Sequence, residues 1–394
     1  MKKVTCLFFF IMFFIGADLF IVSPLLPTLR TAFHISVEHS GWIVSAFALG
    51  YALFALLAGP LSDGWDRKKV MMIGLLSFGL FTLLCGFATT FWGMLLFRFL
   101  AGISGAFVTP QVWASIPQLI PSEKILKAMG IVTAGLAVSQ MIGVPIGSYL
   151  AAFNWRTPFF AVGACSFFMV ILIVFFLPSI PPILSEKKSP SILKRYRVLL
   201  QESRSKITFF AYFVFQLGNF ATFTFMGTWF ADRFNLDVAS IGSVILFLGL
   251  GNTLSSFFSS NWVQKIGLKN SFIWGVIVLI LLFIVLPFLP NIIVVTIFYS
   301  FIYVVIGMVF PIIMRLLQTL STSSRGTISS LANATMYLGS TIGSTVAGIL
   351  YANASGFLSV SLFTVLCLLS SLLLFQKSGV LPSSQQCDTK VSSA

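Results

Sequence analysis

The sequence is poor in charged residues and poorest in acids. Asp, Glu, Lys and Arg make up 9% of its 394 residues, and only ten residues are acidic, whereas soluble domains carry about 25% charged residues. It also contains no Gly-x-x-x-x-Gly-Lys run, the loop that cradles nucleotide phosphates. The composition therefore argues against a soluble domain and against ATP-driven chemistry, and we expect neither an enzyme nor a bound cofactor.

Residue types that bind metals are equally scarce. The two histidines, His34 and His39, lie with Glu38 in one short polar segment, which is more typical of a solvated loop than of a metal site. Of the five cysteines, four fall inside apolar runs, as small packing residues do: Cys6, Cys85, Cys165 and Cys367. We therefore expect no metal ion and no disulfide framework.

What the sequence has in excess is apolar surface. Hydrophobic residues make up 58% of the chain and the mean hydropathy is +1.01, so lipid is the expected solvent. The net charge of +14 is typical of nucleic-acid binding when it forms one patch. Here the charges lie in short runs between apolar segments, which predicts no nucleic-acid partner and a membrane-embedded chain instead.

Twelve apolar stretches of about 18–25 residues are long enough to cross a bilayer. We place them at residues 4–27, 40–61, 70–89, 92–115, 127–150, 157–178, 207–231, 238–262, 271–289, 291–314, 326–351 and 356–375. The expected fold class is an all-α integral membrane protein whose twelve transmembrane helices form two six-helix pseudo-repeat bundles. The expected domains are an N-terminal bundle (1–180), a basic cytoplasmic linker (181–206), a C-terminal bundle (207–375) and a cytoplasmic tail (376–394).

Lys and Arg give the orientation. With the N-terminus inside, 20 of the 24 basic residues lie on the inner side. Arg30, Arg156 and Arg233 lie outside, and Arg98 lies within a helix. The positive-inside rule then predicts a multi-pass protein of the cell membrane with both termini in the cytoplasm.

A polar run between the second and third stretches carries the strongest motif. It reads Gly-Pro-Leu-Ser-Asp-Gly-Trp-Asp-Arg-Lys-Lys over residues 59–69 and resembles the loop motif of the major facilitator superfamily. The matching loop of the second half has Ser260, Gln264, Gly267 and Lys269 in place of Gly59, Asp63, Asp66 and Lys68, as expected of a degenerate repeat. The resemblance implies a gating loop formed by Gly59, Asp63, Arg67 and Lys68; for Asp66, balancing the neighbouring basic residues is an equal alternative.

Two further motifs resemble the drug/proton antiporters of that superfamily. Arg98 lies in a Leu-Phe-Arg-Phe-Leu-Ala-Gly run of the fourth stretch, and Gly143, Pro145 and Gly147 form a shortened Gly-Pro motif in the fifth. Residues Ser148 and Tyr149 stand where the motif ends in two glycines. The N-terminal half is also similar to Bacillus exporters of the bacilysin type.

Asp18 is the one carboxylate deep within a predicted helix, and a charge at the bilayer centre costs about 2.5–3.5 kcal/mol on insertion scales. It therefore needs a partner, a proton or water. We expect Asp18 to carry the coupling proton and Arg98 to be its partner cation. A structural acid and a static ion pair are the alternatives.

Substrate contacts are less specific in sequence. Polar residues on one face of the seventh and eleventh stretches, Gln216, Asn219, Asn333 and Tyr337, are expected to line a cavity or to bond between helices. The expected function is proton-coupled export of small amphipathic or drug-like molecules, including antibiotics, by a monomer that draws on the proton gradient. The alternatives are uptake of a metabolite by proton symport and a transport-inactive membrane sensor.

Overall fold

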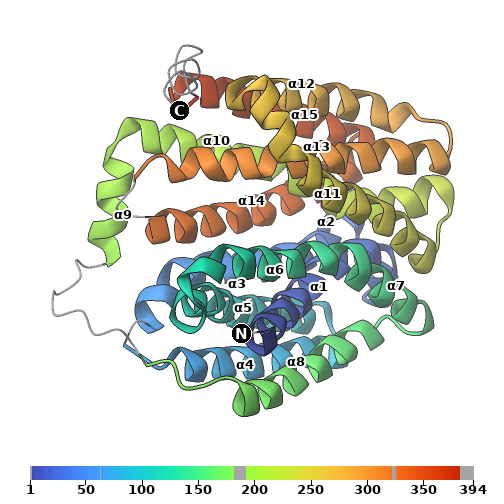
Figure 1. The fold of residues 1–394 in the computed structure, drawn as a ribbon. Helices are drawn as coiled ribbons and strands as arrows, with labels where there is room; N and C mark the ends of the chain where they lie inside the picture. Colours follow the sequence, from blue (N-terminus) through green and yellow to red (C-terminus); the bar gives the residue numbers. More distant parts are fainter. Residues whose placement is uncertain (1, 63, 182–191, 322–324, 382–394) are drawn as a thin grey trace.

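The computed structural model describes residues 2–62, 64–181, 192–321 and 325–381 (Figure 1). Within those ranges the regular elements are helices, without strands. The longer helices are α1 (Lys2–Ala32), α3 (Trp42–Ser62), α4 (Arg67–Phe87), α5 (Phe91–Leu119), α6 (Ile125–Val138), α7 (Val144–Phe153), α8 (Thr157–Phe176), α9 (Ile192–Gln201), α10 (Ser203–Phe234), α11 (Val238–Ile266), α12 (Leu268–Val285), α13 (Ile292–Gln318), α14 (Arg325–Asn353) and α15 (Phe357–Lys377). The short ones are α2 (Val37–Ser40), the 3₁₀ turns Ser122–Lys124 and Leu286–Phe288, and the π turn Ser139–Gly143.

Eleven helical segments in the described residues are long and apolar enough to cross a membrane. The remaining long helix, α14, is not among them because it is rich in Ser, Thr and Gly. It packs against α3 and α10, where the hydroxyl of Thr345 bonds to that of Ser45 in α3 and the hydroxyl of Ser344 bonds to that of Thr224 in α10. The predicted all-helical membrane fold is confirmed, and its most polar member is an inner one.

Several helices extend beyond the predicted spans. The sequence placed the end of the first helix at Pro27, yet α1 continues through Pro24 and Pro27 to Ala32. The hydroxyl of Thr31 donates to the carbonyl of Pro27, which supplements the backbone bonding of that last turn. The predicted linker, residues 181–206, contains α9, and α10 begins within it at Ser203.

Polar caps decide where the helices begin. Asp66, Thr90, Asp237 and Asn291 each accept a hydrogen bond from a backbone N–H of the first turn of α4, α5, α11 and α13. Such caps satisfy donors that have no partner inside the helix. At the other end of α10, Asn235 takes a left-handed conformation with φ of 51° and stops the helix.

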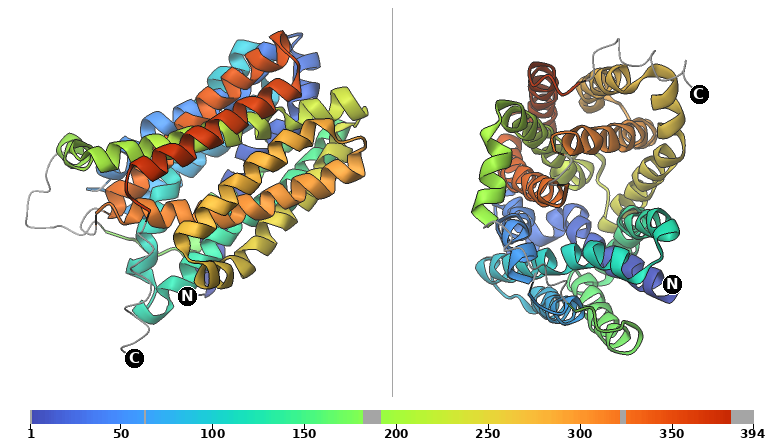
Figure 2. Two further views of the ribbon diagram at one scale, coloured as in Figure 1. Left: turned by 90° about the horizontal axis from the view of Figure 1, so that it is seen from above. Right: turned by 60° about the vertical axis from the view of Figure 1, so that its left-hand side comes forward.

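The helices from α1 to α8 and those from α10 to α15 form two groups that pack side by side (Figures 1 and 2). Between the groups, α3 packs on α14, α1 on α10, and the π turn and α7 on α11. We call the end of the molecule at which α1 begins the inner end, and the opposite end the outer end. Because consecutive helices run in opposite directions, α3 and α11 begin at the outer end.

The two groups are joined near the outer end. The Ser23 hydroxyl of α1 donates to the carbonyls of Phe223 (2.5 Å) and Thr224 (3.1 Å) in α10. The Ser45 hydroxyl of α3 donates to the Thr341 carbonyl of α14 at 2.8 Å. A Cβ at Gly227 would lie 2.6 Å from the Ser23 carbonyl oxygen, so the backbones of α1 and α10 are in direct contact. The structure is therefore closed at its outer end by hydroxyl–carbonyl bonds and glycine contacts.

Candidate functional site

A buried ion pair lies at mid-depth in the N-terminal group. Arg98 of α5 donates from Nη1 to Asp18 Oδ2 of α1 at 2.6 Å, and from Nη2 to the Asp18 carbonyl at 3.4 Å. Both side chains are 0% exposed. The structure thus brings together the two residues that the sequence singled out for coupling, as a direct charge pair away from water.

Backbone packing holds the arginine in place. A Cβ at Gly102 would lie 2.1 Å from the Phe47 carbonyl oxygen, and one at Gly50 would lie 2.2 Å from that of Phe99, so α3 and α5 touch backbone to backbone. This contact sets the Phe47 ring 4.5 Å from the guanidinium carbon of Arg98, a cation–π distance. Sequence reasoning missed Phe47, since a phenylalanine in an apolar helix carries no signal of its own.

The pair keeps polar atoms without hydrogen bonds. Asp18 Oδ1 and Arg98 Nε have none, and neither has the hydroxyl of Thr82, which lies beside Asp18. Cys85, one turn further along α4, faces both charges. A carboxylate can take up a proton, whereas an arginine in a protein keeps its charge. The free oxygen of Asp18 is thus the one atom of the pair where a proton can be gained or lost.

At mid-depth, aromatic residues join the two groups. The rings of Tyr51 in α3 and Tyr337 in α14 stack with centroids 3.8 Å apart. Gln216 in α10 donates to the hydroxyl of Tyr212 at 3.0 Å, and its own Oε1 has no partner. Of the four predicted cavity residues, Tyr337 is buried at this interface and Gln216 is buried within the C-terminal group, whereas Asn219 and Asn333 are half-buried.

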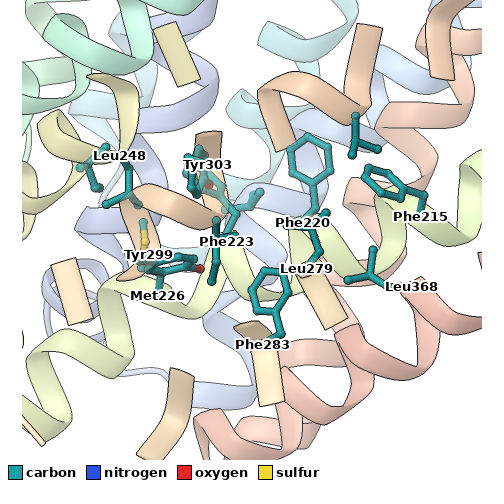
Figure 3. Packing of buried hydrophobic residues seen from close by; sticks show 14 of the residues in the cluster. Phe215, Phe220, Phe223, Met226, Leu248, Leu279, Phe283, Tyr299, Tyr303 and Leu368 are labelled. Carbon is teal, nitrogen blue, oxygen red and sulfur yellow. The ribbon is translucent and has the colours of Figure 1, made fainter. Parts of the chain in front are cut away.

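A second aromatic cluster fills the C-terminal group (Figure 3). Phe223 of α10 lies edge-on to Phe20 of α1, with centroids 5.6 Å apart, and 6.5 Å from Tyr303 of α13. Tyr299, one turn from Tyr303, is buried with its hydroxyl unpaired. The sequence did not single out the two tyrosines, although two phenols four residues apart in an apolar helix are a usable signal.

The Gly-Pro motif of Gly143, Pro145 and Gly147 lies at a change in helical geometry. Residues Ser139–Gly143 form a π turn that ends two residues before Pro145, whose missing N–H breaks the α-helical hydrogen-bond ladder. A Cβ at Gly143 would lie 3.1 Å from that of Ala17, and one at Gly147 would lie 2.4 Å from Ile21. These glycines therefore pack the π turn and α7 against α1 on either side of Asp18.

The basic loop is tied to its own half. Arg67 Nη1 donates to Gln111 Oε1 at 3.1 Å and Lys68 Nζ donates to the Val174 carbonyl at 2.9 Å. Asp66 accepts from the Ser179 hydroxyl at 2.5 Å and from the backbone of Ile180 at 3.2 Å, so it caps α4 and ties the loop to the segment after α8. The backbone of Gly59 lies in the last turn of α3; Asp63 falls outside the described residues.

Sequence and structure comparisons agree on the family. Two overlapping parts of the chain, residues 8–344 and 208–386, match the Major Facilitator Superfamily. The chain belongs to this family. It is 47% identical to the MFS-type transporter YceJ of Bacillus subtilis (strain 168), over 94% of this chain and 95% of the relative. It is 26% identical to multidrug resistance protein 2 of the same organism, over 86% of each chain.

Among solved structures, the fold is similar to a bacterial homolog of the human lysosomal transporter Spinster in an inward-facing, occupied conformation. The TM-score is 0.78 at 15% identity, over 97% of each chain. This membrane transporter therefore carries small molecules and is not an enzyme. The family assignment confirms the resemblance that the loop motif predicted.

Proposed function

We propose that this transporter exports amphipathic, drug-like small molecules in exchange for protons, as a monomer in the cell membrane with both termini in the cytoplasm. The observation that carries the proposal is the fully buried pair of Asp18 and Arg98 with one free carboxylate oxygen. A static pair gains most when every polar atom is bonded. Here one oxygen of Asp18, which can accept a proton, has no hydrogen bond at a fully buried position, where a charge is most costly.

The pair is placed where protonation can act on the outer contacts. Ser23, which bonds to α10, lies five residues after Asp18 in α1. Ser45, which bonds to α14, lies two residues before Phe47 in α3. Protonating Asp18 leaves Arg98 without its counter-charge, and the buried guanidinium then favours a rearrangement that brings it water. Movement of α1 and α3 in that rearrangement strains the bonds that close the outer end.

The proposed substrate class rests on the side chains at and near the contact between the two helix groups. The rings of Tyr51, Tyr337 and Phe223 lie at the contact between the groups, and the amide of Gln216 lies within the C-terminal group beside Tyr212. Aromatic surface with few polar anchors suits amphipathic ligands. The name of the 26%-identical relative, a multidrug resistance protein, supports the same class. The resemblance to bacilysin exporters stays a prediction.

Inverted membrane vesicles test the proposal. With an acid interior, addition of an exported compound such as ethidium is expected to release protons from the vesicle, followed by a pH-sensitive dye. Asp18→Asn is expected to abolish this release. Asp237→Asn is the matched control, because it removes the same charge from an exposed helix cap and Asn caps a helix equally well.

Three results would contradict parts of the proposal. Proton release that survives Asp18→Asn would remove Asp18 from the role of carrier and leave antiport in place. Compound uptake by right-side-out cells along the proton gradient would indicate symport. Binding of compounds without any proton or compound movement would indicate a transport-inactive sensor.

A further inference from the structure

Helix α9 lies across the inner ends of the other helices. In Figure 1 the long helices run along the horizontal direction and α9 runs vertically, and in the left view of Figure 2 it is seen nearly end-on. It precedes α10 by one residue, Glu202. A helix with this direction at the end of a transmembrane bundle lies in the plane of the membrane surface.

One face of α9 is fixed to the protein. The hydroxyl of Tyr196 donates to the Leu56 carbonyl of α3 at 3.3 Å. Leu199 is 6% exposed and Leu200 packs against the hydrophobic core. These residues are three or four positions apart, so they share one side of the helix. The position of α9 is therefore set by contacts with both helix groups, since it also packs on α10.

The other face combines exposed cations with an exposed apolar residue. Arg197 is exposed and Val198 beside it is 61% exposed. Arg204 and Lys206, in the first turn of α10, are exposed as well. The sequence of α9 holds three basic residues and no acid. An exposed apolar residue among cations fits an interfacial helix, in which the apolar group enters the lipid and the cations meet the headgroups.

We infer that the exposed face of α9, together with the first turn of α10, binds the phosphodiester headgroups of anionic phospholipids in the leaflet that contains it. Arg197, Arg204 and Lys206 supply the charge, and Val198 inserts into the lipid. Cations near an anionic membrane surface strengthen binding about fivefold each. This inference uses the membrane location and the basic inner end, and it is independent of the direction of transport and of proton coupling.

The site has a structural consequence for the transporter. Leu56, whose carbonyl holds Tyr196, lies one and a half turns before the inner end of α3, the helix that also carries Phe47 and Ser45. A lipid bound to α9 therefore holds the linker against a helix that joins the charge pair to the outer contacts.

The test uses the full chain reconstituted in phosphatidylcholine vesicles with a photoactivatable phosphatidylglycerol that carries its reactive group in the head. Adducts are located by mass spectrometry. We expect adducts within residues 192–206, at several times the yield of a photoactivatable phosphatidylcholine, and lower yield at high salt because screening weakens the attraction. The triple variant Arg197→Gln, Arg204→Gln, Lys206→Gln should lose at least tenfold in yield.

The matched control is Lys265→Gln, Lys269→Gln, Lys377→Gln, which removes the same charge from the same end of the molecule; its adduct yield at 192–206 should be unchanged. The inference is overturned if both lipids react equally there, or if the control loses as much as the test variant. It is also overturned if soluble glycerol phosphate at equal concentration displaces the lipid, because the site would then belong to a free phosphate. Salt dependence of the unmodified chain decides the case if the triple variant does not fold.

Discussion

Asp18 and Arg98 place two opposite charges at mid-depth in the N-terminal half, whereas the C-terminal half has tyrosines and phenylalanines there. The sequence of the second half contains no charged residue over 207–231, 271–314 or 326–376. Buried charge is costly and aromatic packing is not. Under the proposed function, proton chemistry would belong to the first half, and the second half would offer a neutral surface to a substrate.

The loops at the inner end repeat this contrast. Asp66 and Gly267 occupy the same position, the residue before α4 and before α12. Asp66 caps its helix with a carboxylate, while Gly267 makes the turn with φ of 85° and no side chain. The first half again uses a charge where the second uses backbone geometry. The two halves are thus repeats in shape that differ in electrostatics.

The largest expected effect comes from breaking the ion pair on one side only. Asp18→Leu leaves the permanent charge of Arg98 buried without a partner, at a cost of about 3–5 kcal/mol in the free energy of unfolding. Arg98→Leu should cost less, because Asp18 can neutralise itself by taking up a proton. The double variant should lie closer to the parent than Asp18→Leu does. Unfolding in mixed detergent micelles measures all three.

Gln216→Leu is the control from the second half. Gln216 is buried and polar but uncharged, and its removal should change the free energy of unfolding by about 1 kcal/mol. Equal losses for Asp18→Leu and Arg98→Leu would mean that Asp18 does not change its protonation. A loss for Gln216→Leu as large as for Asp18→Leu would remove the contrast between the halves.

A smaller effect is expected from the neutral contacts that join the halves. Gly227→Ala places a methyl group 2.6 Å from the Ser23 carbonyl oxygen and 2.9 Å from Pro24 Cα, both backbone atoms. This overpacking should destabilise the outer-closed state by about 1–3 kcal/mol. The equilibrium between that state and the others should therefore shift about 5- to 150-fold away from it. Spin labels on Ala152 and Ala354, exposed near the outer end of each half, should report a longer distance.

Gly130→Ala serves as the control for that experiment, since a Cβ at Gly130 meets no atom within 4 Å. Its label distance should match that of the parent. An unchanged distance in Gly227→Ala would show that the outer contacts do not hold the halves together.

A finer test concerns the ring beneath the arginine. Phe47→Leu removes the cation–π contact, which contributes about 0.5–2 kcal/mol. In a double-mutant cycle with Arg98→Leu, Phe47 should show a coupling energy of that size in the free energy of unfolding. Phe78 of α4 is also fully buried, and Phe78→Leu should cost the same with or without Arg98. Zero coupling for Phe47 would mean that its ring only fills space.

The sequence was sufficient for what depends on local composition. Apolar length predicted the helices, and the isolated charges Asp18 and Arg98 predicted the pair, because an intramembrane charge has few alternatives. The sequence did not predict the roles of Phe47, Tyr299 and Gly227, because each role depends on which other helix the residue contacts. The amphipathic pattern of α9 was visible as basic residues among apolar ones, but the surrounding polar linker masked its helical period.

The last and smallest effect on stability is expected at the paired loop positions Asp66 and Gly267, which should differ in how that effect depends on pH. Burial acts to raise the pKa of Asp66, but hydrogen bonds from Ser179, Ile180 and Lys68 outweigh it and hold the pKa below its ordinary value. The lowered pKa means that Asp66 stabilises the fold fully above about pH 4, and that this contribution is lost as the pH falls through the folded-state pKa. Asp66→Ala should lower the free energy of unfolding by about 1 kcal/mol at neutral pH, and the difference from the parent should shrink in acid.

Gly267→Ala should lower the free energy of unfolding by a similar amount at every pH, because a side chain at φ of 85° is strained. A loss for Asp66→Ala that persisted in acid would mean that the carboxylate charge contributes nothing, and the two loops would then differ in shape alone.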